Sequence, residues 1–136
     1  CELKCGEVIE EAMAMVEEAE MIGSVTFLSF ELTHLESVRA RSSQAQVSWL
    51  VPRPTDESIR ASELLRAQWL DVDYRRVDAD LVRRAGDAGL KLRAWVPNDG
   101  ESFRRLKRLG VGAITTDRPD LLLAFRSTEE NNGNTV

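Results

Sequence analysis

Short apolar runs recur along the 136-residue chain at intervals of 20 to 24 residues. Each interval has room for one strand, one helix and two short loops. Strands that alternate with helices predict a parallel sheet, because parallel strands need crossover connections. Runs such as Val25–Leu28 and Gly112–Ile114 are almost continuously apolar, as expected for strands buried on both faces. The predicted strands are centred near Leu3, Phe27, Ser48, Val72, Leu92 and Ile114.

Helical patterns fill the intervals between these runs. Apolar residues recur at helical spacing beneath polar faces, and capping residues stand before several of the segments. Thr55 or Asp56 can cap the third helix and Asp78 the fourth, while Asn98 has capping-box spacing to Glu101. The predicted helices cover residues 7–21, 31–41, 58–67, 79–88, a segment from Asn98 that stops at Gly110, and a short segment 121–125 opened by Asp117 and Pro119.

The strand and helix repeat favours a (β/α) barrel of the TIM type. No Gly-x-Gly-x-x-Gly motif follows a strand, which argues against a dinucleotide-binding fold. A closed barrel needs eight units over roughly 200 residues or more, whereas six units fit this chain. The sequence therefore predicts an incomplete α/β barrel with six of eight units. Because the chain starts inside a strand, we expect the missing two to precede it.

Composition and charge exclude several classes of function. The net charge is −5, and the basic residues of the second half are interleaved with acidic ones, so a nucleic-acid surface is not expected. No apolar run approaches the roughly 20 residues that span a bilayer. Cys1 and Cys5 are too far apart in an extended segment for a disulfide and lack zinc-binding partners, so we interpret them as free thiols.

In such barrels the functional side chains lie at the carboxyl ends of the strands. Glu2 and Lys4 are two residues apart on a predicted strand, so their side chains share one face. A carboxylate and an ammonium there suit a divalent cation and an anionic substrate. The alternative, favoured by spacing alone, is an exposed pair at the end of the chain.

Other strand ends carry candidate contacts with a ligand. Trp95 alternates with Leu92 and Ala94, so it points away from the leucines and either lines a substrate site or belongs to the core. Asn98 and Asp117 are interpreted as helix caps, and Ser29 as a residue that satisfies a helix end. The single histidine, His34, falls within a helix and is interpreted as a surface or packing residue.

Four of these strand ends together resemble the C-terminal part of the glycerophosphodiester phosphodiesterase family. They are Glu2–Lys4, Ser29–Phe30 followed by a leucine-rich helix, Gly89–Leu90 leading to Trp95–Asn98, and Thr116–Pro119. Their order and spacing agree with the family over nearly the whole chain. Val96-Pro97 departs from the Thr-Val that the family places between the Trp and the Asn.

The resemblance implies a hydrolase of lipid metabolism that converts glycerophosphodiesters to sn-glycerol 3-phosphate and an alcohol with calcium or magnesium. Glu2 then matches a metal ligand, Lys4 a charged position near the phosphate, and Trp95 the aromatic residue beside the glycerol. Residues 1–126 would form barrel strands three to eight, and residues 127–136 a polar C-terminal tail. The cytoplasm is the favoured location, while secretion or a periplasmic location stays open.

The family mechanism also needs two histidines, an arginine beside the first and a Glu-x-Asp pair, and this sequence has none of these at matching positions. We therefore expect no catalytic residue in this chain and no activity from it alone. Two alternatives stay open. One is a non-catalytic half-barrel that binds or assembles, with self-association through its open sheet edges. The other is a phospholipase-like phosphodiesterase.

Overall fold

A single sheet of five parallel strands runs through the molecule. The computed structural model describes residues 1–133, with side chains as far as Thr128. Strand order follows chain order, β1-β2-β3-β4-β5, and each strand pairs only with its sequence neighbours. The strands are β1 (Thr26–Ser29), β2 (Gln46–Val51), β3 (Trp69–Asp73), β4 (Lys91–Trp95) and β5 (Ala113–Thr115).

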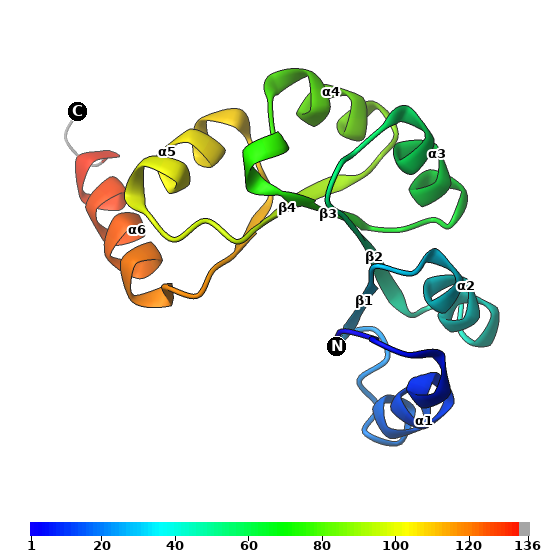
Figure 1. Ribbon diagram of the computed structural model, residues 1–136. Coiled ribbons are helices and arrows are strands. Elements are labelled where there is room, and N and C mark those ends of the chain that lie inside the picture. Colours follow the sequence, from blue (N-terminus) through cyan, green and yellow to red (C-terminus); the bar gives the residue numbers. More distant parts are fainter. Residues whose placement is uncertain (134–136) are drawn as a thin grey trace.

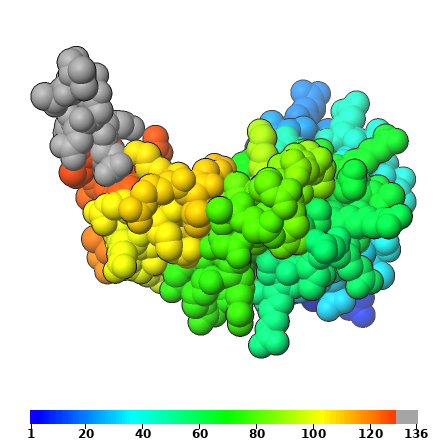
Figure 2. Space-filling view, turned by 90° about the horizontal axis from the view of Figure 1, so that it is seen from above, coloured from blue at the N-terminus to red at the C-terminus, as the bar shows by residue number. Residues whose placement is uncertain are grey.

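The sheet is curled, and the helices lie along its outer side (Figure 1). Seen from outside the arc, helices α3, α4 and α5 form a continuous outer surface, with α6 at one end (Figure 2). The predicted fold class is confirmed, because five parallel strands alternate with helices in part of a barrel. The helices are α1 (Ile9–Glu18), α2 (Leu32–Arg41), α3 (Asp56–Leu64), α4 (Ala79–Asp87), α5 (Gly100–Leu109) and α6 (Pro119–Gly133), with short 3₁₀ turns η1 (Gly6–Val8) and η2 (Tyr74–Arg76).

The first predicted strand is reduced to one bridge. Glu2 pairs in parallel with Leu28, and the Leu3 N–H donates to the Leu28 carbonyl at 2.7 Å. The Leu28 N–H in turn donates to the Cys1 carbonyl at 2.9 Å. The segment therefore lies in the place of a sixth strand, but η1 starts at Gly6 and leaves too few extended residues for a ladder.

Local sequence explains where most helices begin and end. Thr55 forms a reciprocal capping box with Ser58 at the start of α3, and Asp78 accepts from the Leu81 N–H at the start of α4. Gly110 ends α5 with a φ of 82°, in the left-handed region that favours glycine. The last helix is longer than predicted, since α6 reaches Gly133 and includes much of the expected 127–136 tail. Residues 134–136 lie outside the described part of the chain.

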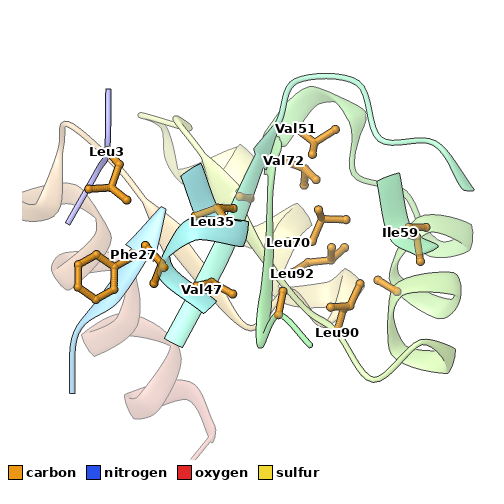
Figure 3. Packing of buried hydrophobic residues seen from close by; sticks show 14 of the residues in the cluster. Leu3, Phe27, Leu35, Val47, Val51, Ile59, Leu70, Val72, Leu90 and Leu92 are labelled. Atoms are coloured by element: carbon orange, nitrogen blue, oxygen red, sulfur yellow. The ribbon is translucent and has the colours of Figure 1, made fainter. Parts of the chain in front are cut away.

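The core lies between the sheet and its helices. Phe27, Val47, Leu70 and Leu92 come from four adjacent strands and are buried on the helix-facing side (Figure 3). Leu35 of α2 and Ile59 of α3 belong to the same cluster. Because side chains alternate across a strand, the residues between these point to the concave face. That face carries the polar and aromatic side chains described below.

Candidate active site

A cleft of about 220 Å³ opens on the concave face of the sheet. It is formed by the residues that alternate with the buried core leucines and valines, together with the residues that follow the strand ends. Two predicted site residues, Glu2 and Trp95, meet in this cleft although they are far apart in the sequence. The lining residues are Glu2, Leu28, Phe30, Leu50, Asp71, Arg93, Trp95, Val96 and Thr115.

The bridge to Leu28 places Glu2 at the edge of the cleft. Its side chain is 37% exposed and lies 3.9 Å from the Lys4 ammonium, measured from Oε1 to Nζ. Lys4 is 79% exposed and does not line the cleft. The two side chains therefore lie close together, as the spacing predicts, but only the carboxylate faces the cleft walls.

Trp95 forms an aromatic wall with Phe30. The two rings meet edge to face, with centroids 5.9 Å apart and an interplanar angle of 86°, a favourable aromatic geometry. The peptide between Trp95 and Val96 is cis. The indole Nε1 is buried and has no hydrogen-bond partner among the described residues. Trp95 therefore lines the cleft with its aromatic ring, while its N–H donor is covered by protein atoms.

The strand interior adds a buried polar group that the sequence analysis did not single out. Asp71 of β3 is 2% exposed, accepts a hydrogen bond from Ser48 Oγ, and lies 3.6 Å from the Arg93 guanidinium. Burial raises the pKa of Asp71, and the Ser48 hydrogen bond and the Arg93 charge act in the opposite direction. Arg93 also stacks over the Trp69 ring at 4.9 Å. In the sequence, the sign of this buried group was that polar residues stand at alternate positions along β3 and β4.

The two strand ends of β4 and β5 are tied together by Asn98. Its side-chain oxygen accepts from Thr116 Oγ1 at 2.8 Å and from the Asp117 N–H at 2.9 Å, and its amide donates to the Asp117 carboxylate at 3.0 Å. The predicted capping role of Asn98 is wrong, because Asp99 caps α5 through the Ser102 N–H. Asp117 contacts Asn98 rather than the first turn of α6 in the part described.

The single histidine takes part in packing. Ser29 Oγ donates to the Leu3 carbonyl at 2.7 Å and accepts from the Glu31 N–H at 3.1 Å, next to the start of α2. The Nδ1 atom of His34 lies 3.1 Å from the same oxygen. Ser29 thus satisfies a helix end, as predicted, and His34 is held on the helix side of β1, away from the cleft residues.

A second carboxylate ends β3. Asp73 forms a two-pronged ion pair with Arg75, at 2.6 Å from Nη2 to Oδ2 and 2.9 Å from Nε to Oδ1. The Arg75 hydrogen bonds lower the pKa of the Asp73 carboxyl. Arg105 of α5 donates to the carbonyls of Tyr74 and Val77, so the loop after β3 is fixed from both sides.

The residues present do not complete a metal site. Among the side chains that the structure describes, residues 1–128, no group of three or more His, Cys, Asp or Glu is placed to hold a metal ion. Asp71 lines the same cleft as Glu2, but its Oδ2 atom is already bound by Ser48 and faces the Arg93 guanidinium. Glu2 thus supplies one carboxylate, fewer than a divalent cation needs from a protein cage.

A model of the Glycerophosphoryl diester phosphodiesterase family matches residues 4–121. The chain belongs to this family. The match covers β1 to β5 and the first residues of α6, and it confirms the family resemblance. Among curated proteins none matches.

Solved structures of this glycerophosphodiester phosphodiesterase family share the fold. A protein from Silicibacter pomeroyi assigned to the family is 26% identical, with a TM-score of 0.74 over 82% of this chain and 41% of its own. One from Agrobacterium tumefaciens is 25% identical, with a TM-score of 0.82 over 96% and 57%. An Oleispira antarctica phosphodiesterase, solved with the product sn-glycerol-3-phosphate, is 24% identical, with a TM-score of 0.79 over 93% and 53%.

The chain therefore spans 41% to 57% of the length of these three structures. Within residues 1–133 no helix is both long enough and apolar enough to cross a membrane. Both cysteines are free, as predicted, and both are exposed.

Proposed function

We propose that this chain forms the substrate-lining part of a metal-dependent glycerophosphodiester phosphodiesterase of lipid metabolism. The reaction would hydrolyse a glycerophosphodiester to sn-glycerol 3-phosphate and an alcohol. The single observation that carries the proposal is the family match over residues 4–121, on a fold that brings Glu2 and Trp95 to one cleft.

The proposed roles follow from the chemistry of each side chain. Trp95 offers an apolar ring to the glycerol carbons. Lys4, exposed beside Glu2, would offset phosphate charge at the edge of the cleft. Glu2 would be one oxygen ligand of a calcium or magnesium ion, which when bound would polarise the phosphoryl oxygen.

Catalysis is not expected from the chain alone. General acid and base catalysis of this reaction needs two groups that exchange protons with substrate and water. The one histidine of the sequence, His34, is bound to Ser29 behind the sheet, and the carboxylates within residues 1–128 do not form a cation site. We propose that the acid–base pair and the remaining metal ligands come from a part of the barrel outside residues 1–136.

The test is complementation. The chain is assayed on glycerophosphocholine with calcium or magnesium, by itself and after co-expression with the complementary barrel segment of the Agrobacterium tumefaciens relative. We expect sn-glycerol 3-phosphate only from the assembled pair, with activity falling at least about tenfold in Glu2→Gln. An exposed glutamate outside the cleft, Glu57→Gln, is the matched control. Turnover by the chain alone would disprove the proposal that the acid–base pair lies outside it.

The open sheet edges bear on how the chain behaves in solution. Among residues 1–133, β5 has a partner strand on one side only, and β1 is followed at the other edge only by the Glu2 bridge. Unpaired edges favour self-association, so we propose that the chain alone associates as its concentration rises, which size-exclusion chromatography would detect. The exposed free thiols favour a reducing compartment, and we propose the cytoplasm.

A further inference from the structure

A second cavity lies on the outer side of the sheet, where the loops after β2 and β3 meet the start of α4. Its volume is about 240 Å³, and three of its six lining residues are arginines. We call it the arginine pocket. It is lined by Arg53, Pro54, Arg76, Asp78, Leu81 and Arg84.

Two of the three guanidinium groups form no ion pair among the described residues. Arg84 donates to the carboxylates of Asp80 and Asp56, so its charge is compensated. Arg53 and Arg76, in contrast, form no ion pair and no side-chain hydrogen bond in the part of the chain that the structure describes. Two exposed guanidinium groups therefore converge on one hollow with their donors unused.

The loops that carry these arginines are fixed. Arg53 stands between Pro52 and Pro54, and the Thr55–Ser58 capping box follows at once. The turn η2, which ends in Arg76, is held by the Asp73 carboxylate on one side and by Arg105 on the other. A fixed backbone loses less entropy when a ligand binds, so the loops that carry the two arginines are preorganised.

The remaining walls define the ligand. Guanidinium groups bind oxyanions in a two-pronged geometry that suits phosphate. The first turn of the nine-residue helix α4 faces the same hollow and adds its dipole, although the carboxylate of Asp78 occupies the Leu81 N–H. Pro54 and Leu81 provide an apolar surface next to the charges. The set suits a phosphate group joined to a short carbon skeleton.

We propose that the arginine pocket binds the phosphate oxyanion of a small phosphorylated molecule or a phospholipid headgroup. The site is separate from the cleft at Glu2 and Trp95, since the two share no lining residue. The proposal does not depend on the proposed function, and its test measures binding rather than turnover.

The experiment titrates the full chain with inorganic phosphate and follows backbone amide signals by NMR, with sodium chloride at equal ionic strength as reference. We expect saturable shifts at Arg53, Arg76 and Leu81. In the double variant Arg53→Ala/Arg76→Ala the affinity should fall at least about tenfold, because two charge-assisted contacts are lost. Arg53→Lys/Arg76→Lys, which keeps the charge without the planar fork, should show a smaller loss.

The matched control is Arg60→Ala/Arg108→Ala, which removes the same charge from exposed arginines outside the pocket. Equal weakening in this control, or no saturable shift in the unaltered chain, would overturn the proposal.

Flotation with phosphatidylcholine vesicles containing phosphatidic acid identifies the source of the bound phosphate group. Phosphate binding together with vesicle binding that the double variant loses indicates a headgroup, and phosphate binding alone indicates a soluble ligand. Vesicle binding without phosphate binding would contradict the site.

Discussion

The side-chain oxygen of Asn98 accepts a hydrogen bond from the backbone N–H of Asp117, 2.9 Å away and 19 residues later in the chain. This contact joins the loop after β4 to the loop after β5. The Thr116 hydroxyl donates to the same Asn98 oxygen. The Thr116 hydroxyl in turn accepts a hydrogen bond from the Arg118 N–H. The two strand ends that mark the family in the sequence are thus parts of one hydrogen-bonded unit at the rim of the cleft.

Replacing Asn98 tests this unit. In Asn98→Ala the Asp117 N–H and the Thr116 hydroxyl lose their acceptor. We expect the free energy of unfolding to fall by about 1 kcal/mol, since the site is exposed and water replaces part of the contact. Urea denaturation measures the change. Arg108→Ala, on the exposed face of α5, should stay within about 0.5 kcal/mol of the parent chain, and an equal loss in both variants would contradict the role of Asn98.

The capping assignment at α5 gives a second prediction. Asp99 accepts from the Ser102 N–H at 2.8 Å, so Asp99→Ala should lower the free energy of unfolding by about 1 kcal/mol. Asp99→Ser should restore most of it, because serine also caps. Glu101→Gln, at the position that a capping box from Asn98 would use, should change stability by no more than about 0.5 kcal/mol. Thermal unfolding by circular dichroism distinguishes the two positions.

Asp73 predicts a dependence of stability on pH. Its pKa is lowered from the ordinary value of 3.8 by Arg75, so the folded chain holds this carboxylate charged more readily than the unfolded chain does. The contribution is present above pH 3.8 and is lost as the pH falls through the lower folded pKa.

Asp73→Asn should therefore lower the free energy of unfolding by about 1 kcal/mol at pH 7, a value discounted for the exposure of Arg75. The difference from the parent chain should shrink in acid. A difference that stays constant from pH 7 to about pH 3 would contradict this account.

The Asp71 and Arg93 pair predicts the opposite dependence of stability on pH. Arg93→Met would leave a buried carboxylate with Ser48 as its remaining partner, at an expected cost of about 3 kcal/mol near pH 7. Because burial already raises the pKa of Asp71, this cost should grow as the pH rises through the folded pKa and diminish below 3.8. Urea unfolding at two pH values measures it. The double variant Asp71→Asn/Arg93→Met should recover much of the loss, since no charge stays buried.

Much of the fold was predictable because it depends on neighbours in the sequence. The spacing of apolar runs gave five strands in their correct places, and the caps Thr55 and Asp78 and the stop at Gly110 depend on local chemistry. The role of Asn98 could not be found in this way. Its partners follow the next strand, and that long-range contact outweighs the local capping pattern that Asp99 fulfils instead.

Part of the site was also predictable from residues that are neighbours in the sequence. Alternation along β4 placed Trp95 opposite Leu92, and the structure has it so. Alternation also paired Glu2 with Lys4, but it did not separate the residue that lines the cleft from the one that faces solvent. The buried Asp71 was missed because its meaning depends on Ser48 and Arg93, which come from the strands on either side of β3.

The strand order has a consequence for how the molecule opens. Within residues 1–133 each strand is hydrogen-bonded only to the strands before and after it in the chain, so the sheet behaves as a row of units rather than as a closed ring. Units at the ends of a row have one neighbour and those in the middle have two. Local opening should therefore begin at β5 and at the Glu2 bridge and move inward, leaving the amides of β3 as the last to exchange with solvent.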